Sequence, residues 1–109
     1  MPKYRVDELD FGAAEEFFEE RPEYRHLRVR RRADLLTIES DSAQGPVPRA
    51  RLRQVTAQLW RLEMSTHKGR WEKTPFREDL MVLLNLLVTD FGWTLAPLDG
   101  RPSESDAGR

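Results

Sequence analysis

The strongest constraint on the fold is a leucine-rich segment between Thr74 and Gly92. Thr74 can cap a first helical turn, and Pro75 suits the first helical position because its missing N–H needs no partner there. Gly92 favours an end to the helix, since glycine adopts a left-handed conformation at little cost. The segment therefore predicts a long helix over residues 75–91. Its core-facing stripe comprises Phe76, Leu80, Leu83, Leu84, Leu87 and Phe91.

The same segment is apolar well beyond this stripe. Between Leu80 and Val88 only Asn85 is polar. A helix with so little polar surface has to be covered on more than one side, by another part of the chain or by another molecule. We therefore expect self-association through the flanks of the helix, using Met81, Val82, Leu86 and Val88, unless an N-terminal helix closes the exposed flank.

That N-terminal helix is predicted over residues 11–20. Asp10 can cap its first turn, and Pro22 forbids its continuation. One side of the predicted helix is apolar and the other carries Glu15, Glu16, Glu19 and Glu20. Four carboxylates could hold a divalent cation, but without a histidine or a second acidic helix we expect a solvated face and no metal.

Between the two helices the sequence alternates with a period of two. Residues 26–32 and 35–39 predict a hairpin, although Arg32-Ala33-Asp34 is a weak turn signal, and residues 41–48 predict a loop. A turn over residues 66–69 predicts a second hairpin that returns through residues 70–73, and residues 93–96 predict a short last strand. We expect an α+β fold: an antiparallel sheet of four to five strands with helices on one face and water on the other.

Residues 49–64 fit two patterns. Arg49, Arg51 and Arg53 alternate with less polar residues as in a strand, whereas Leu52, Val55, Leu59 and Leu62 recur at helical spacing. We favour strands, because the alternation continues through Trp60, Leu62 and Met64. The three tryptophans, Trp60, Trp71 and Trp93, are expected to pack in the core or at sheet edges rather than to bind a ligand.

Charge is distributed unevenly along the chain. Residues 1–20 carry two basic and seven acidic side chains, residues 21–77 carry fourteen basic and six acidic, and residues 78–109 carry two basic and six acidic. The middle of the chain is therefore a basic block between two acidic ones. In strands, this block would place Arg28, Arg30 and Arg32 beside Arg49, Arg51 and Arg53 on one sheet face.

Six crowded guanidinium groups require anions. Glu39, Glu63 and Glu72, or the acidic N-terminal helix, can supply them from within the chain. A phosphate backbone is the external alternative, with a basic and aromatic hairpin tip formed by His67, Lys68, Arg70, Trp71 and Lys73. The sequence pI of about 6.1 argues against it, because nucleic-acid-binding domains are usually basic overall.

The sequence offers little for catalysis. It contains no cysteine and only two histidines, His26 and His67. It has no glycine-rich phosphate loop and none of the common metal-binding motifs. We therefore expect no enzymatic activity and no cofactor, with an enzyme centred on His67 as the least favoured alternative.

Together these features predict a small, non-enzymatic protein-binding or accessory protein that self-associates. The alternative is a nucleic-acid-binding module that uses the arginine-rich face. No apolar run approaches the roughly 20 residues that span a bilayer, so we expect a soluble, cytoplasmic protein with no membrane partner. Residues 1–98 are expected to form one domain, and residues 99–109 a disordered tail.

Overall fold

The computed structural model describes residues 4–66 and 70–97, which form two α-helices and one five-stranded sheet. The strands are β1 (Leu27–Arg32), β2 (Leu35–Ser42), β3 (Gly45–Gln54), β4 (Trp60–Ser65) and β5 (Trp71–Glu78), and they follow one another across the sheet in chain order. Every neighbouring pair is antiparallel. The predicted α+β class is confirmed, and so is the choice of strands for residues 49–64.

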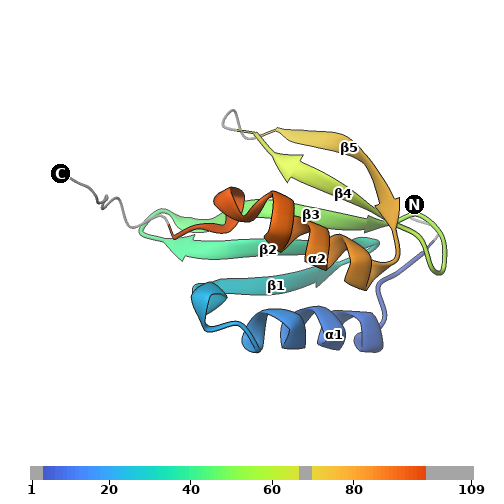
Figure 1. Cartoon of the computed structure of the whole chain (residues 1–109), viewed down its shortest axis with the longest axis horizontal. Helices are drawn as coiled ribbons and strands as arrows, with labels where there is room; N and C mark the ends of the chain where they lie inside the picture. Colours follow the sequence, from blue (N-terminus) through green and yellow to red (C-terminus); the bar gives the residue numbers. More distant parts are fainter. Residues whose placement is uncertain (1–3, 67–69, 98–109) are drawn as a thin grey trace.

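Both helices lie on the same face of the sheet (Figure 1). Helix α1 (Glu8–Glu19) lies beside β1 and contacts α2 (Leu80–Asp90), which also packs on β4 and β5. Two short 3-10 turns complete the description, η1 (Pro22–Tyr24) and η2 (Gly92–Leu95). The core between the layers is built from inward-facing strand residues and one face of each helix, including Phe17, Leu36, Ile38, Leu52, Trp60, Leu62, Leu83, Leu84 and Leu87.

The C-terminal helix is shorter than predicted, because residues 71–78 form an edge strand. Asp79 caps the helix instead of Thr74, its carboxylate accepting a hydrogen bond from the Val82 amide at 3.0 Å. The Thr74 hydroxyl instead donates to the Leu62 carbonyl of β4 at 2.8 Å. Pro75 is tolerated because an edge strand can leave one backbone position unpaired. Thr74 and Pro75 therefore belong to the edge strand β5, although the same residues also suit the start of a helix.

Phe76 and Phe91 still meet, although they do not share a helix. Phe76 lies on β5 and Phe91 follows the last turn of α2, and their rings contact edge to face at 5.9 Å between centroids. The buried part of the predicted stripe is therefore Leu80, Leu83, Leu84 and Leu87. This contact ties β5 to the end of the helix.

The first helix begins earlier than predicted. Asp7 is its N-cap, and the Asp7 carboxylate accepts a hydrogen bond from the Asp10 amide at 2.8 Å. Asp10 therefore lies in the first turn, where a negative charge is favoured by the helix dipole. The helix ends at Glu19, close to the predicted boundary.

Residues 41–48 form a hairpin rather than a loop. Strand β2 runs to Ser42 and β3 starts at Gly45, whose φ of 110° suits glycine. Pro46 and Pro48 pair with β2 alone, because pairing of β3 with β4 begins only at Ala50. The two prolines therefore remove no hydrogen bond from the interior of the sheet.

The turn between β1 and β2 forms without the residues that usually favour a turn. Ala33 adopts a positive φ of 54°, a conformation that costs a non-glycine residue roughly 1–2 kcal/mol. Tertiary hydrogen bonds hold the turn in place: the Val6 amide donates to the Ala33 carbonyl at 2.9 Å, and the Gln54 amide to the Asp34 carbonyl at 2.8 Å. Neither contact can be read from the local sequence.

Two further predictions concern the end of the chain. The short last strand over residues 93–96 is wrong, because this segment forms η2 and buries Leu95 completely in the core. The predicted tail over residues 99–109 lies outside the described residues. The hairpin predicted at residues 66–69 is closed by a hydrogen bond from the Thr66 amide to the Arg70 carbonyl at 2.8 Å, and residues 67–69 are also outside the described part.

Candidate binding surfaces

The sheet face opposite the helices is covered by charged side chains. Strand alternation turns Leu36, Ile38, Leu52 and Leu62 toward the helices and their neighbours toward the open face. The open face carries eight cations and three carboxylates, and Asp34 at the β1–β2 turn adds a fourth. The cations are Arg28, Arg30, Arg32, Arg51, Arg53, Arg61, Lys73 and Arg77; the carboxylates on the strands are Glu39, Asp41 and Glu63.

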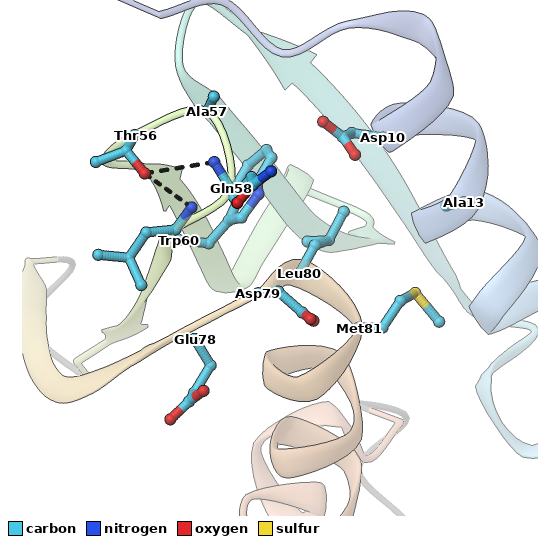
Figure 2. Close-up of a pocket in the computed structure, with 11 residues that line it drawn as sticks. Asp10, Ala13, Thr56, Ala57, Gln58, Trp60, Glu78, Asp79, Leu80 and Met81 are labelled. Atoms are coloured by element: carbon cyan, nitrogen blue, oxygen red, sulfur yellow. Dashed lines mark hydrogen bonds between the residues drawn. The ribbon is translucent and has the colours of Figure 1, made fainter.

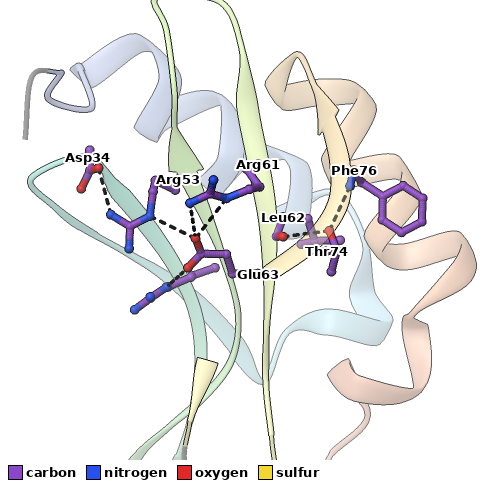
Figure 3. A network of polar contacts seen from close by, with 8 residues as sticks. Asp34, Arg53, Arg61, Leu62, Glu63, Thr74 and Phe76 are labelled. Atoms are coloured by element: carbon purple, nitrogen blue, oxygen red, sulfur yellow. Dashed lines mark hydrogen bonds and ion pairs between the residues drawn. The ribbon is translucent and has the colours of Figure 1, made fainter. Parts of the chain in front are cut away.

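Glu63 on β4 is the centre of the larger ionic network (Figure 3). Its side chain is only 2% exposed, and it accepts hydrogen bonds from Arg51 Nε at 2.6 Å, Arg53 Nε at 3.0 Å and Arg61 Nη2 at 3.0 Å. Burial alone raises the pKa of this carboxyl, but the hydrogen bonds from the three arginines outweigh it and hold the pKa of Glu63 below its usual value. Glu63 is therefore ionised in the folded protein near neutral pH.

Arg53 links this network to the β1–β2 turn. Its Nη1 donates to Asp34 Oδ2 at 3.0 Å while its Nε contacts Glu63. Burial lowers the pKa of Arg53, but the two carboxylates more than compensate, so the pKa is raised. The strained turn at Ala33 and the middle of the sheet are thus held by the same guanidinium group.

Glu39 on β2 organises a second, smaller network. Its carboxylate is 1% exposed and pairs with Arg28 Nη2 and with Arg30 Nε, each at 3.0 Å. Arg28 also forms an ion pair, at 2.9 Å, with Asp41, which lies on β2 like Glu39. The internal neutralisation considered from the sequence is therefore present for four of the predicted arginines, through Glu39 and Glu63 rather than through Glu72 or the first helix.

Arg49 does not belong to this face, contrary to the prediction. A bulge shifts the β2–β3 register, so that Ile38 pairs with Ala50 and Glu39 pairs with Pro48. The Arg49 side chain is consequently buried on the helix side, 5% exposed, and donates to Ser40 Oγ at 3.1 Å and to the Thr94 carbonyl at 2.7 Å. Burial lowers its pKa, and its Nη2 has no hydrogen-bond partner among residues 4–66 and 70–97.

The remaining predicted anion-binding residues divide into three groups. Arg32 and Lys73 lie on the open face and form no ion pair with another described residue. Arg70 and Trp71 lie at the start of the last hairpin strand, where Trp71 packs on Arg51 with 4.3 Å from the guanidinium carbon to the ring centroid. His67 and Lys68 lie outside the described residues.

Sequence reasoning missed Arg61 and Arg77. The register pairs Arg53 with Arg61 and Arg61 with Arg77, so three arginines stand side by side across β3, β4 and β5. The alternation of Trp60, Leu62 and Met64 was the available signal, since it places Arg61 and Glu63 on the opposite face. The position of Arg77 could not be found, because its segment was assigned to the helix.

An aromatic groove lies between the β4–β5 hairpin and η2. It has a volume of about 900 Å³. Trp93 is 75% exposed at its rim, so the prediction that it packs at an edge or in the core is wrong, whereas Trp60 is buried in the core. The lining residues are Met64, Ser65, Thr66, Arg70, Trp71, Glu72, Thr74, Phe91 and Trp93.

A second cleft, of about 710 Å³, opens between the first turns of α1 and α2 and the β3–β4 loop (Figure 2). Asp10, Glu78 and Asp79 are the acidic residues among those that line it. Burial, followed by the charge of Asp7, raises the pKa of Asp10. Within residues 4–66 and 70–97, no three histidine, aspartate or glutamate side chains are placed to hold a metal ion.

The described residues give no geometric support to the alternative of an enzyme centred on His67. His26 lies 2.6 Å from the Leu95 carbonyl through its Nε2, which makes it an anchor for η2. His67 lies outside the described part of the chain. His26 lines neither of the two clefts described above.

The predicted self-association residues differ in exposure. Met81 is 43% exposed and Val82 is 46% exposed, whereas Leu86 and Val88 are half-buried against the core. Helix α1 contacts α2 and Met81 lines the cleft between them, so the intramolecular competitor is present on that flank. Val82 does not line this cleft and is exposed for a contact with another molecule.

Comparison of the chain with models of known protein families, with curated proteins and with solved structures gives no match. In the part of the chain that the structure describes, neither helix has the length and apolar character needed to cross a bilayer.

Replacing Glu63 with glutamine tests the larger network. The Glu63→Gln variant leaves Arg51 and Arg61 without a carboxylate and Arg53 with Asp34 alone. We expect the free energy of unfolding to fall by about 3 kcal/mol in urea denaturation at pH 7. Because folding lowers the pKa of Glu63, its stabilising effect is present above the unfolded value of 4.5 and is lost as the pH falls through the folded value. The difference between the two proteins should therefore shrink on acidification.

Glu72→Gln is the matched control, since Glu72 is exposed on β5. It should change stability by no more than about 0.5 kcal/mol. Equal stabilities for the Glu63 variant and the unmodified protein would contradict the role of the network.

Proposed function

We propose that this protein is a non-enzymatic binding protein and that its aromatic groove receives an apolar segment of a partner protein. The observation that carries the proposal is Trp93, whose large side chain is 75% exposed at a groove that also contains Phe91, Trp71 and Met64. An indole left in water beside other apolar side chains is typical of an interaction site. We propose that the protein acts in the cytosol.

The groove is supported by a rigid frame. Residues on both sides of Trp93 are anchored: Arg49 donates to the Thr94 carbonyl at 2.7 Å, and Phe91 packs against Phe76. Leu95 is fully buried, and its carbonyl contacts His26 at 2.6 Å. A side chain presented from such a fixed turn loses little freedom on binding, which favours affinity.

The composition of the groove also suits a protein ligand. Tryptophan, methionine and arginine are enriched where protein interfaces bury most of their binding energy. The groove combines Trp93, Trp71 and Met64 with Arg70 and Glu72 at the polar margin. This arrangement supports recognition of an apolar segment flanked by polar or charged residues.

Trp93→Ser tests the proposal directly. Because Trp93 is largely exposed, the variant should keep its thermal midpoint while losing at least about tenfold in affinity for peptides selected from a displayed random library. Affinities would be measured by isothermal titration calorimetry with synthetic copies of the selected peptides.

Leu9→Ser provides the control, since Leu9 is 84% exposed on α1, away from the groove. It should bind the same peptides with unchanged affinity. Failure to select any peptide, or equal binding by the Trp93 variant, would overturn the proposal.

Self-association is the second candidate, supported by the exposure of Met81 and Val82 on α2. Val82→Glu should convert an oligomer into a monomer without unfolding it, as judged by light scattering and circular dichroism. Leu86 is a poorer test site, because it is half-buried and a glutamate there would also disturb the core. A monomeric unmodified protein at high micromolar concentration would exclude this candidate.

A further inference from the structure

A shallow cavity of about 200 Å³ on the open face gathers three arginines and one tryptophan. Arg30 and Arg32 come from β1, Arg51 from β3 and Trp71 from β5, while Thr37 and Leu35 of β2 contribute to the floor. We refer to these residues as the arginine cradle. It is on the opposite side of the sheet from the helices.

The two paired arginines of the cradle retain unused donors. Arg30 contacts Glu39 through Nε at 3.0 Å, and Arg51 contacts Glu63 through Nε at 2.6 Å. Neither arginine uses Nη1 or Nη2 in a hydrogen bond to another described residue. A guanidinium group has five N–H donors, so most of its capacity remains available while the carboxylate fixes its position.

Arg32 supplies the uncompensated charge. It is exposed and has no ion pair among residues 4–66 and 70–97. Arg30 is also accessible, with 58% of its side chain exposed. Three guanidinium groups around one small cavity favour a multidentate anion such as a phosphate group over a single hydrogen-bond acceptor.

Trp71 adds a flat apolar surface to this anion site. It is half-buried, and the Arg51 guanidinium carbon lies 4.3 Å from its ring centroid. An indole next to guanidinium donors matches a ligand that carries an aromatic ring close to a phosphate. A nucleotide has both parts, whereas the carboxylates of an acidic peptide would leave the indole unused.

We propose that the arginine cradle binds a nucleotide unit of single-stranded nucleic acid, with the phosphate held by Arg30, Arg32 and Arg51 and the base stacked on Trp71. Single strands are favoured because their bases are free to reach an aromatic side chain on a sheet surface, whereas those of a duplex are stacked and paired. This proposal is independent of the aromatic groove, apart from the shared residue Trp71.

The test uses fluorescence anisotropy with a labelled ten-nucleotide oligothymidylate and a duplex of equal length, each at 50 and 200 mM salt. We expect the full chain to bind the single strand and to prefer it to the duplex. Arg32→Ala should weaken binding several-fold and lower the magnitude of the log–log salt slope by about 0.7, as expected for one lost phosphate contact. Trp71→Leu should weaken binding about tenfold with little change in that slope.

Arg31→Ala is the matched control. Arg31 is the adjacent arginine in β1, but its guanidinium lies over the Phe11 ring of α1, at 5.2 Å, rather than in the cradle. Binding by this variant should equal that of the unmodified protein. Equal weakening by Arg31→Ala and Arg32→Ala would overturn the proposal, as would the absence of binding at 50 mM salt or a preference for the duplex.

Thymidine monophosphate distinguishes the two sources of the same chemistry. If it competes as well as the oligonucleotide at equal nucleotide concentration, the cradle recognises a free nucleotide and the single-strand proposal is wrong. If it competes at least about tenfold more weakly, contacts to neighbouring phosphates contribute and the strand is the ligand. Arg32→Ala should leave peptide binding in the aromatic groove unchanged, so this test fails or succeeds separately from that of the groove.

Discussion

The ion pairs that surround two buried carboxylates, Glu39 and Glu63, fix the centre of this structure. Each carboxylate is about 1% exposed at the residue level, yet each lies on the sheet face that no helix covers. The arginines themselves provide the cover. Because an unpaired buried charge costs several kcal/mol, only a strand register that brings arginines to both carboxylates is stable. Sliding one strand by a residue would turn these charges into the leucine core.

The network also determines what the open face can bind. Each carboxylate holds its arginines at fixed positions, so the guanidinium groups of Arg30 and Arg51 are placed before any ligand arrives. With eight cations against four carboxylates, the surface keeps a net positive charge although the whole chain is slightly acidic. Local charge and the overall pI therefore point in different directions, and a ligand contacts the local surface.

Arg49 plays the corresponding part on the helix side. A buried cation without a carboxylate is destabilising in itself, but its hydrogen bond to the Thr94 carbonyl fixes the turn that carries Trp93. The bulge in β3 sends this arginine through the sheet and separates it from Arg51 and Arg53. The bulge thus affects the candidate groove, because it places Arg49 where it can hold the turn that carries Trp93.

The sequence predicted the strand alternation, the α+β class and the burial of Leu80, Leu83, Leu84 and Leu87, because these follow from local periodicity. It did not predict the side of the sheet on which Arg49 lies, since one inserted residue reverses the alternation and leaves no local signal. Thr74-Pro75 misplaced the helix start because the same residues suit both a helix cap and an edge strand. The exposure of Trp93 could not be predicted, because it depends on which residues η2 buries, and tertiary contacts decide this.

The most direct test of the network is to measure the ionisation of Glu63. Carbon-13 NMR would record the signal of its side-chain carboxyl during an acid titration of the folded protein. Three arginine hydrogen bonds should keep its pKa below the ordinary value of 4.5, so the carboxyl should remain ionised when the pH falls below that value. A Glu63 carboxyl that titrates at or above 4.5 while the protein is folded would show that burial dominates and that the arginines do not hold it.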